Sequence, residues 1–202
     1  MLQLLIDFLF PPNQEELRIR SLSPESFERE APLAPKAEFP FINSVFAYKN
    51  PIVKELIWQI KYKKNKHAVK IAGFALHDWL YKNNMTGILI PIPISKKRRK
   101  ERGFNQCQLL IDEIIRLDVE GKFIKNYDLL IRPKNIDKQT LKNREERIEN
   151  SKNIFEVTEK LTSQQKIIII DDVSTTGSTL KEAHDALIKA GYANVYSLTV
   201  AH

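Results

Sequence analysis

The sequence contains a single cysteine, Cys107, among its 202 residues. It can therefore form no internal disulfide and no structural zinc site built from several cysteines. Long apolar runs are also missing, because the apolar stretches, such as residues 2–10 and 167–170, are too short to span a bilayer. The first run lacks a basic leader and contains Asp7, so we expect no signal peptide. These absences predict a cytoplasmic protein without a membrane segment.

Acidic side chains are fewer than basic ones, with 25 Asp and Glu against 32 Lys and Arg, and the formal net charge is +7. This excess favours anionic partners but does not distinguish phosphorylated metabolites from nucleic acid. A lysine-rich surface without a binding role would give the same balance. The distribution of the charge along the chain is therefore more informative than its total.

Regular structure is expected to be sparse in residues 1–43. Prolines recur there at positions 11, 12, 24, 32, 35 and 40. Proline interrupts helices and removes a hydrogen-bond donor from sheets. We therefore predict an irregular N-terminal appendage, or hood, over residues 1–43 and a main domain over residues 44–202.

From residue 44 onward, helical and strand patterns alternate. Helices are expected over residues 52–60, 67–81, 106–117 and from the turn after residue 172 to residue 190, where Gly191 is the expected stop. Strands are expected over residues 44–48, 88–92, 127–131, 155–157, 166–170 and 195–200. This alternation predicts an α/β fold with a mostly parallel sheet and helices on both faces.

The strongest functional signal is the segment IIIIDDVSTTGSTL, residues 167–180. A buried strand ends at two aspartates, and a hydroxyl-rich turn leads into a helix whose start is supported by a possible Thr179–Glu182 capping box. Parallel sheets bind ligands beyond the carboxyl ends of their strands, and a helix N-terminus attracts anions. The turn supplies hydroxyls and a glycine that permits close backbone approach: Ser174, Thr175, Thr176, Gly177, Ser178 and Thr179. These features predict a phosphate site.

Two adjacent carboxylates, Asp171 and Asp172, would repel a phosphate unless they face another group. The vicinal hydroxyls of a ribose, or a metal ion bound to pyrophosphate, are suitable partners for them. The segment has only one of the glycines that a dinucleotide fold needs, and it lacks the Gly-Lys pair of a P-loop. A receiver domain has the acidic pair without the hydroxyl-rich turn. The remaining alternative is a strand–turn–helix that uses small residues for turn chemistry alone.

This segment resembles the phosphoribosyl pyrophosphate (PRPP) motif of type I phosphoribosyltransferases, and the wider chain resembles the ComF family. The resemblance is carried by PIPISKKRRKERGFNQ at 91–106, by LKNREERIEN at 141–150, by the PRPP motif with the last strand, and more weakly by residues 46–64. It implies a type I phosphoribosyltransferase-like fold and a homodimer. It also implies that Asp171 and Asp172 hold the ribose hydroxyls, directly or through Mg²⁺, while residues 174–179 wrap the 5′-phosphate.

The resemblance further implies that the turn after residues 88–92 binds pyrophosphate. Its candidate residues are Ser95, Lys96, Lys97 and Arg98, and the last two join the aspartates as candidate catalytic residues. Arginine and lysine are suited to diphosphate oxygens. A solvated basic turn and a nucleic-acid patch are the alternatives.

A mobile loop is implied over residues 137–150, where Lys142, Arg144 and Arg147 would help to close the site over PRPP and exclude water. The alternative is a charged surface helix.

Two positions depart from the pattern of related proteins. ComF relatives usually carry paired zinc-binding cysteines, but residues 13–40 contain neither Cys nor His. Purine-salvage enzymes often place an aspartate two residues before the motif glycine as a general base, where this chain has Thr175. A hydroxyl cannot act as that base near neutral pH.

Two functions follow as hypotheses. The first is a Mg²⁺-dependent phosphoribosyltransferase that transfers phosphoribose from PRPP to an unidentified nucleobase-like acceptor and releases pyrophosphate. The alternative is a non-catalytic PRPP- or nucleotide-binding protein that assists DNA uptake. In that case, single-stranded DNA could follow the basic residues 95–102 and the lysines at 61, 63, 64 and 66 beside Tyr62.

Overall fold

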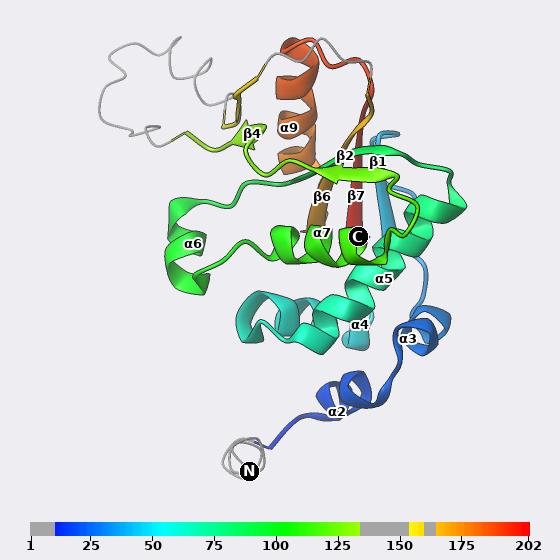
Figure 1. The fold of residues 1–202 in the computed structure, drawn as a ribbon. Coiled ribbons are helices and arrows are strands. Elements are labelled where there is room, and N and C mark those ends of the chain that lie inside the picture. Colours follow the sequence, from blue (N-terminus) through cyan, green and yellow to red (C-terminus); the bar gives the residue numbers. More distant parts are fainter. Residues whose placement is uncertain (1–10, 134–153, 160–164) are drawn as a thin grey trace.

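A computed structural model describes residues 11–133, 154–159 and 165–202. Its centre is a five-stranded, all-parallel sheet in the order β1-β7-β6-β2-β3 (Figure 1). The strands are β1 (Ile42–Phe46), β7 (Val195–Ala201), β6 (Ile167–Val173), β2 (Gly87–Pro91) and β3 (Phe123–Lys125). A separate antiparallel pair joins β4 (Leu130–Ile131) to β5 (Glu156–Val157).

The sheet is covered on both faces, which explains the unbroken isoleucine run of β6. Ile168 and Ile170 face a core shared with α4 (Pro51–Trp58), α5 (Lys66–Lys82) and α7 (Gln106–Leu117). Ile167 and Ile169 face the opposite core, which includes the apolar side of α9 (Ser178–Lys189). Because strand side chains alternate between faces, a strand buried on both sides must be apolar at every position. The predicted α/β class is confirmed.

Most predicted elements appear within two residues of their expected bounds, but β6 extends three residues beyond its expected end. In addition, α4 is followed directly by a π-helix, η1 (Gln59–Lys63). The C-cap of η1 is Lys64, which has a φ of +49°. The strand expected over residues 127–131 is displaced: β3 lies earlier in the chain, and only β4 falls inside that range. The expected capping box was wrong, because α9 begins at Ser178 after Gly177 and has no side-chain cap.

The N-terminal segment is more regular than its prolines suggested. It forms two short helices, α2 (Gln14–Ser21) and α3 (Pro24–Glu30). Pro24 stands in the first turn of α3, behind the capping Ser23, where a proline needs no hydrogen-bond partner for its nitrogen. Ile19 and Phe27 are fully buried in the core that contains α4 and α5. The division of the chain at residue 43 stays a prediction, and β1 begins just before it.

A buried carboxylate links α2 to the π-helix. Glu16 is 5% exposed, and its oxygens accept hydrogen bonds from Lys63 Nζ at 2.9 Å and Arg20 Nη2 at 2.8 Å. Burial alone would raise the pKa of Glu16, but these two cations lower the pKa overall. The pair with Lys63 thus links α2 to η1, the segment that supplies Lys61 to the site described below, whereas Arg20 lies within α2 itself.

Across the part of the chain that the structure describes, no helix has both the length and the apolar character needed to cross a membrane.

Candidate functional site

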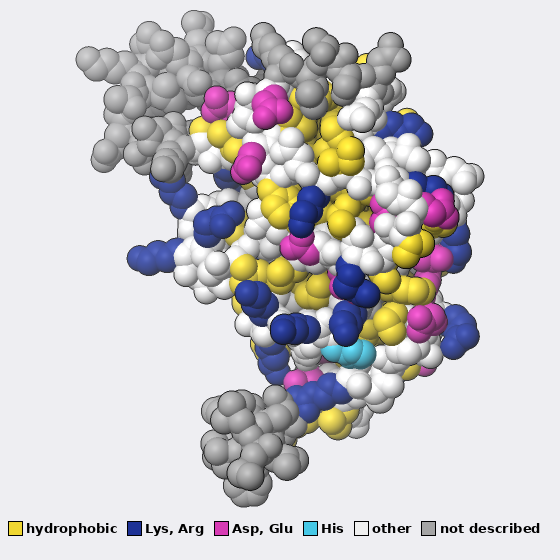
Figure 2. Space-filling model, in the orientation of Figure 1, with side chains coloured by type: hydrophobic (Ala, Val, Ile, Leu, Met, Phe, Trp, Pro, Cys, Tyr) yellow, Lys and Arg dark blue, Asp and Glu magenta, His cyan; other side chains and the backbone are white. Residues whose placement is uncertain are grey.

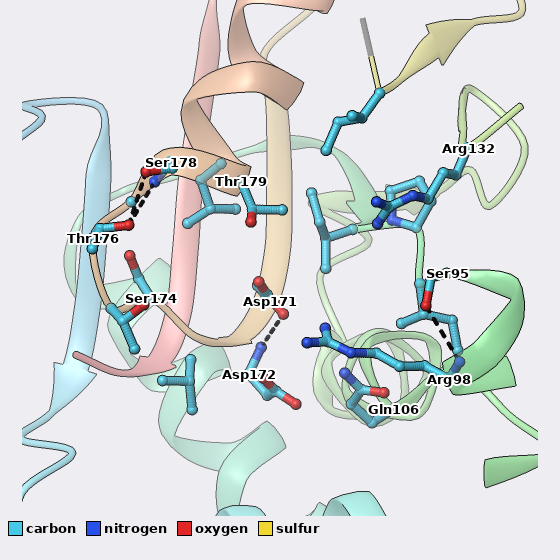
Figure 3. A pocket seen from close by; sticks show the side chains of 18 of the residues that line it. Ser95, Arg98, Gln106, Arg132, Asp171, Asp172, Ser174, Thr176, Ser178 and Thr179 are labelled. Carbon is cyan, nitrogen blue, oxygen red and sulfur yellow. Dashed lines mark hydrogen bonds between the residues drawn. The ribbon is translucent and has the colours of Figure 1, made fainter. Parts of the chain in front are cut away.

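A pocket of about 490 Å³ lies at the carboxyl ends of β6 and β2 (Figure 3). Its walls include residues 171–180, Ser95, Arg98, Gln106, Arg132, Tyr48 and Lys61. Open parallel sheets place ligand sites at this edge, because the loops that leave their strands converge there. The sequence segment with the strongest functional signal therefore lines a real cavity.

Residues 174–179 form a cup between β6 and α9, which we call the hydroxyl cup. The Thr176 and Ser178 hydroxyls lie 2.8 Å apart, and the Ser174 hydroxyl is buried without a hydrogen-bond partner among the described residues. The free N–H groups of the first turn of α9 are available at the same place. The cup therefore combines the unpaired Ser174 hydroxyl with further hydroxyls and a helix N-terminus, which suits a phosphate group.

Gly177 is required at the cup for two reasons. Its φ of +72° is a conformation that glycine adopts without strain. A Cβ atom at this position would also lie 2.9 Å from carbon atoms of both Ile42 and Phe39. The cup is thus packed directly against β1 and the segment before it, and a larger residue would displace it.

Asp171 and Asp172 are buried, with exposed fractions of 9% and 3%. Asp171 Oδ1 accepts the backbone N–H of Asp172 at 2.7 Å and the Cys107 thiol at 3.5 Å. Burial, reinforced by the charge of Asp172, raises the pKa of Asp171 to about 7. Burial and the same carboxylates also raise the pKa of the Cys107 thiol, which favours the protonated thiol over the nucleophilic thiolate.

Lys61 is one member of the site that the sequence analysis did not identify as such. It extends from η1, and its Nζ lies 3.0 Å from Asp172 Oδ1 with only 19% of its side chain exposed. The sequence grouped Lys61 with neighbouring lysines as a surface cation, and its pattern gave no signal that it faces inward. π-Helical turns are rare and recur at functional sites.

The other oxygen of Asp172, Oδ2, is buried and has no hydrogen-bond partner within the described residues. An unpaired buried carboxylate oxygen is costly, so a ligand hydroxyl or a cation is the natural partner. Among those residues, no group of three or more His, Cys, Asp or Glu could hold a metal ion. Carboxylates are the kind of ligand that Mg²⁺ takes in proteins, and an ion held by these two would need its remaining ligands from water or a bound molecule.

The predicted basic turn is a short helix, α6 (Lys96–Arg102), capped by the Ser95 hydroxyl, which accepts the Arg98 N–H at 3.3 Å. Because a helix directs successive side chains to different sides, the four predicted pyrophosphate residues separate. Ser95 and Arg98 line the pocket, whereas Lys96 and Lys97 line only a neighbouring one, which Ser95 also borders. The Lys97 side chain is 86% exposed and lies 3.9 Å from Glu101.

Figure 3 shows how the parts face one another. The cup side chains Ser174, Thr176, Ser178 and Thr179 lie on one side, and Ser95, Arg98, Gln106 and Arg132 lie on the other, with the two aspartates between. Sequence reasoning missed Gln106 and Arg132, which come from α7 and from the residue after β4. The predicted loop residues Lys142, Arg144 and Arg147 lie outside the described residues.

Comparisons with known proteins agree with this geometry. Residues 131–202 match the phosphoribosyl transferase domain family. The chain is 34% identical over 161 residues to competence protein ComFC of Bacillus subtilis, covering 78% of this chain and 62% of that protein. It is 29% identical over 152 residues to DNA utilization protein YhgH of Escherichia coli K12, covering 72% and 65% respectively. Competence protein F of Haemophilus influenzae is 34% identical over 106 residues, with coverage of 51% and 44%.

The chain thus spans less than two thirds of the length of these relatives. Among solved structures, it is similar to a hypoxanthine phosphoribosyltransferase from Staphylococcus aureus, with a TM-score of 0.38 and 15% identity over 67% of this chain and 63% of that one. The matched domain, the ComF relatives and the parallel sheet with its hydroxyl cup agree with one another. The chain belongs to the ComF family of the type I phosphoribosyltransferase superfamily.

Proposed function

We propose that the pocket binds PRPP with Mg²⁺ and that the protein transfers the phosphoribosyl group to a nitrogenous acceptor. The observation that carries this proposal is the arrangement in Figure 3, in which the hydroxyl cup and Arg98 lie on opposite sides of the paired aspartates. A sugar with a phosphate at one end and a diphosphate at the other needs hydrogen-bond donors at both ends and acceptors for its hydroxyls between them.

Each part of PRPP has a matching part of the pocket. The hydroxyl cup and the N-terminus of α9 would hold the 5′-phosphate. The ribose hydroxyls would donate to Asp171 and Asp172, giving Asp172 Oδ2 the partner it lacks. Ser95 and Arg98 would hold the pyrophosphate. Mg²⁺, when bound by the carboxylates and the diphosphate, would neutralise charge on the leaving group.

The transfer itself requires little from protein acids and bases. The bond between the anomeric carbon and the pyrophosphate oxygen breaks, and its electron pair leaves with pyrophosphate. The acceptor nitrogen forms the new bond to that carbon, and its proton is released to solvent. Because Thr175 replaces the carboxylate base, the acceptor must be nucleophilic without help from this position. Binding of the remote 5′-phosphate would hold the anomeric carbon in place for attack.

Calorimetry with PRPP and Mg²⁺ tests the site. We expect saturable binding by the wild type and at least a tenfold loss in the double variant Asp171→Asn, Asp172→Asn. Asp185→Asn is the matched control, because Asp185 is an exposed aspartate of α9 that pairs with Lys181 outside the pocket. Pyrophosphate release during a screen of nucleobases then tests transfer. A wild-type protein that does not bind PRPP would refute the proposed site.

A second candidate function is handling of single-stranded DNA during uptake, supported by the names of the ComFC and YhgH relatives and by one surface. The rings of Trp58, Phe104 and Tyr62 each have a cation within 5.0–5.2 Å of their centroids, supplied by Lys63, Lys64 and Arg102 respectively. Figure 2 shows lysine and arginine side chains gathered over α6 and over the region of α4 and η1. Aromatic faces beside cations suit unpaired bases and a phosphate backbone.

Anisotropy of a labelled oligodeoxynucleotide tests this candidate. We expect salt-dependent binding that survives the double aspartate variant and weakens severalfold in Lys64→Glu. Lys189→Glu, at the exposed end of α9, makes the same charge change away from these rings and should have a smaller effect. Equal effects of the two lysine variants would show that net charge alone governs binding.

A further inference from the structure

A second cleft, of about 530 Å³, adjoins the pocket beside α4 and η1. It is lined by Tyr48, Lys54, Glu55, Trp58, Lys61 and Tyr62, among others. Tyr48 and Lys61 line both cavities. Because Lys61 also contacts Asp172, the cleft reaches the end of the pocket where the ribose would lie.

One wall of the cleft is aromatic. Trp58 and Tyr62 are four residues apart across the junction of α4 and η1, and they are 43% and 61% exposed. Their ring centroids are 6.0 Å apart at 44°, so the rings are not stacked face to face on each other. Two large exposed aromatic side chains at one concave surface are unusual in a folded protein and commonly mark a binding site. They offer ready-placed surfaces for a planar ligand.

Polar groups of both kinds accompany the rings. The Glu55 carboxylate is held in place by hydrogen bonds from Gln59 at 2.9 Å and Asn13 at 3.2 Å. Lys61 is held by Asp172. A fixed carboxylate can accept from a ring N–H or an exocyclic amine, and an ammonium can donate to a ring nitrogen or carbonyl. An aromatic wall with one fixed acceptor and one fixed donor matches the face and edge of a nucleobase.

The cleft is also set apart from the residues that would hold the leaving group. Ser95 and Arg98, which would hold the departing pyrophosphate, line the pocket but do not line the cleft. A displacement at the anomeric carbon brings the acceptor from the side away from the leaving group. The entry beside Tyr48 and Lys61 provides that separation.

We propose that this cleft binds the planar heterocyclic acceptor of the phosphoribosyl group. The ring lies against Tyr62 and Trp58, and its polar edge faces Lys61 and Glu55. This inference rests on the proposed function, since it assigns an acceptor site to the same pocket. The expected occupant is a free base, and the experiment below distinguishes it from a base within a DNA strand.

Fluorescence of Trp58 reports directly on the cleft. The chain has two tryptophans, so Trp79→Phe leaves Trp58 as the only tryptophan, which can be excited selectively at wavelengths where tyrosine does not absorb. The probes are adenine, hypoxanthine, uracil and cytosine, each titrated in the presence of PRPP and Mg²⁺. We expect saturable quenching by at least one base, and at least fivefold weaker base affinity when Tyr62→Ala is added.

Tyr81→Ala is the matched control in the same Trp79→Phe background. Tyr81 also has a lysine over its ring, with Lys122 Nζ 3.8 Å from the centroid, but it lies outside both cavities. Its removal should leave base affinity within twofold of the Trp79→Phe protein. Calorimetry should show unchanged PRPP binding in both tyrosine variants, which verifies that the pocket is intact.

The outcomes separate the two ideas. If PRPP binds but no base quenches Trp58, or if Tyr62→Ala behaves like Tyr81→Ala, the acceptor cleft is wrong and the PRPP site stands. If PRPP does not bind the wild type, the proposed function fails instead. If only an oligodeoxynucleotide quenches Trp58, the cleft belongs to nucleic acid and the acceptor assignment is overturned.

Discussion

Replacing Lys61 with methionine would remove the cation that contacts Asp172 while keeping most of the side-chain volume. At their 3.0 Å separation, two unit charges attract by about 5 kcal/mol at an effective dielectric constant near 20. Removing one partner of a buried pair typically costs about 3–5 kcal/mol. Because Lys61 remains 19% exposed, solvent would recover part of this, and we expect a loss of about 2–3 kcal/mol in the free energy of unfolding.

Urea denaturation of the metal-free protein at pH 7.5 measures this loss. Wild type, Lys61→Met, Asp172→Asn and the double variant form a cycle whose coupling energy should be about 2 kcal/mol. Lys181→Met is the control, since its exposed partner Asp185 makes that ion pair worth less than about 1 kcal/mol.

The deficit of Lys61→Met should also shrink as the pH falls. The Lys61 charge lowers the pKa of Asp171, so its removal moves that pKa further above about 7. Protonation then neutralises the acidic pair more readily and relieves the repulsion that the missing cation left. Additive effects in the cycle, or a deficit that grows toward acid pH, would refute the view that Lys61 neutralises Asp172.

Two further predictions concern the acidic pair and the cup. Burial raises the pKa of Asp171 to about 7, so the native state binds this proton more tightly than the unfolded chain does. The free energy of unfolding should therefore decrease as the pH rises from 4 to 7, by up to about 1.4 kcal/mol per pH unit. Asp171→Asn should reduce this pH dependence when the free energy of unfolding is measured by urea denaturation. An unchanged pH dependence would show that another group causes it. Gly177→Ala should destabilise the protein by more than about 1 kcal/mol and weaken PRPP binding, whereas Gly121→Ala, with a similar φ but nothing within 4 Å of its Cβ, should cost less in thermal unfolding. Equal costs would show that backbone strain, not contact with Ile42 and Phe39, explains the glycine.

Local signals existed for two elements that the sequence analysis described differently. The basic run is preceded by Ser95, an N-cap, and followed by Gly103, which ends the helix in the left-handed conformation. These two residues are typical helix boundaries and would have predicted α6. Ser23 before Pro24 likewise marks the start of α3. In both places, charge and proline content outweighed the capping residues in the interpretation.

The sequence alone was sufficient to predict the strand, the aspartates, the hydroxyl cup and the helix of residues 167–180, because these parts are contiguous and each follows from local backbone geometry. It also determined the sheet class, since burial on both faces requires the unbroken apolar run of β6. Other residues that face the cup, by contrast, could not be predicted from any local pattern. Lys61, Gln106 and Arg132 come from three separate segments, and their meeting depends on how η1, α7 and the chain after β4 pack around the sheet. A lysine in a basic stretch has the same sequence pattern whether it points to water or to a buried aspartate, so packing alone makes that choice.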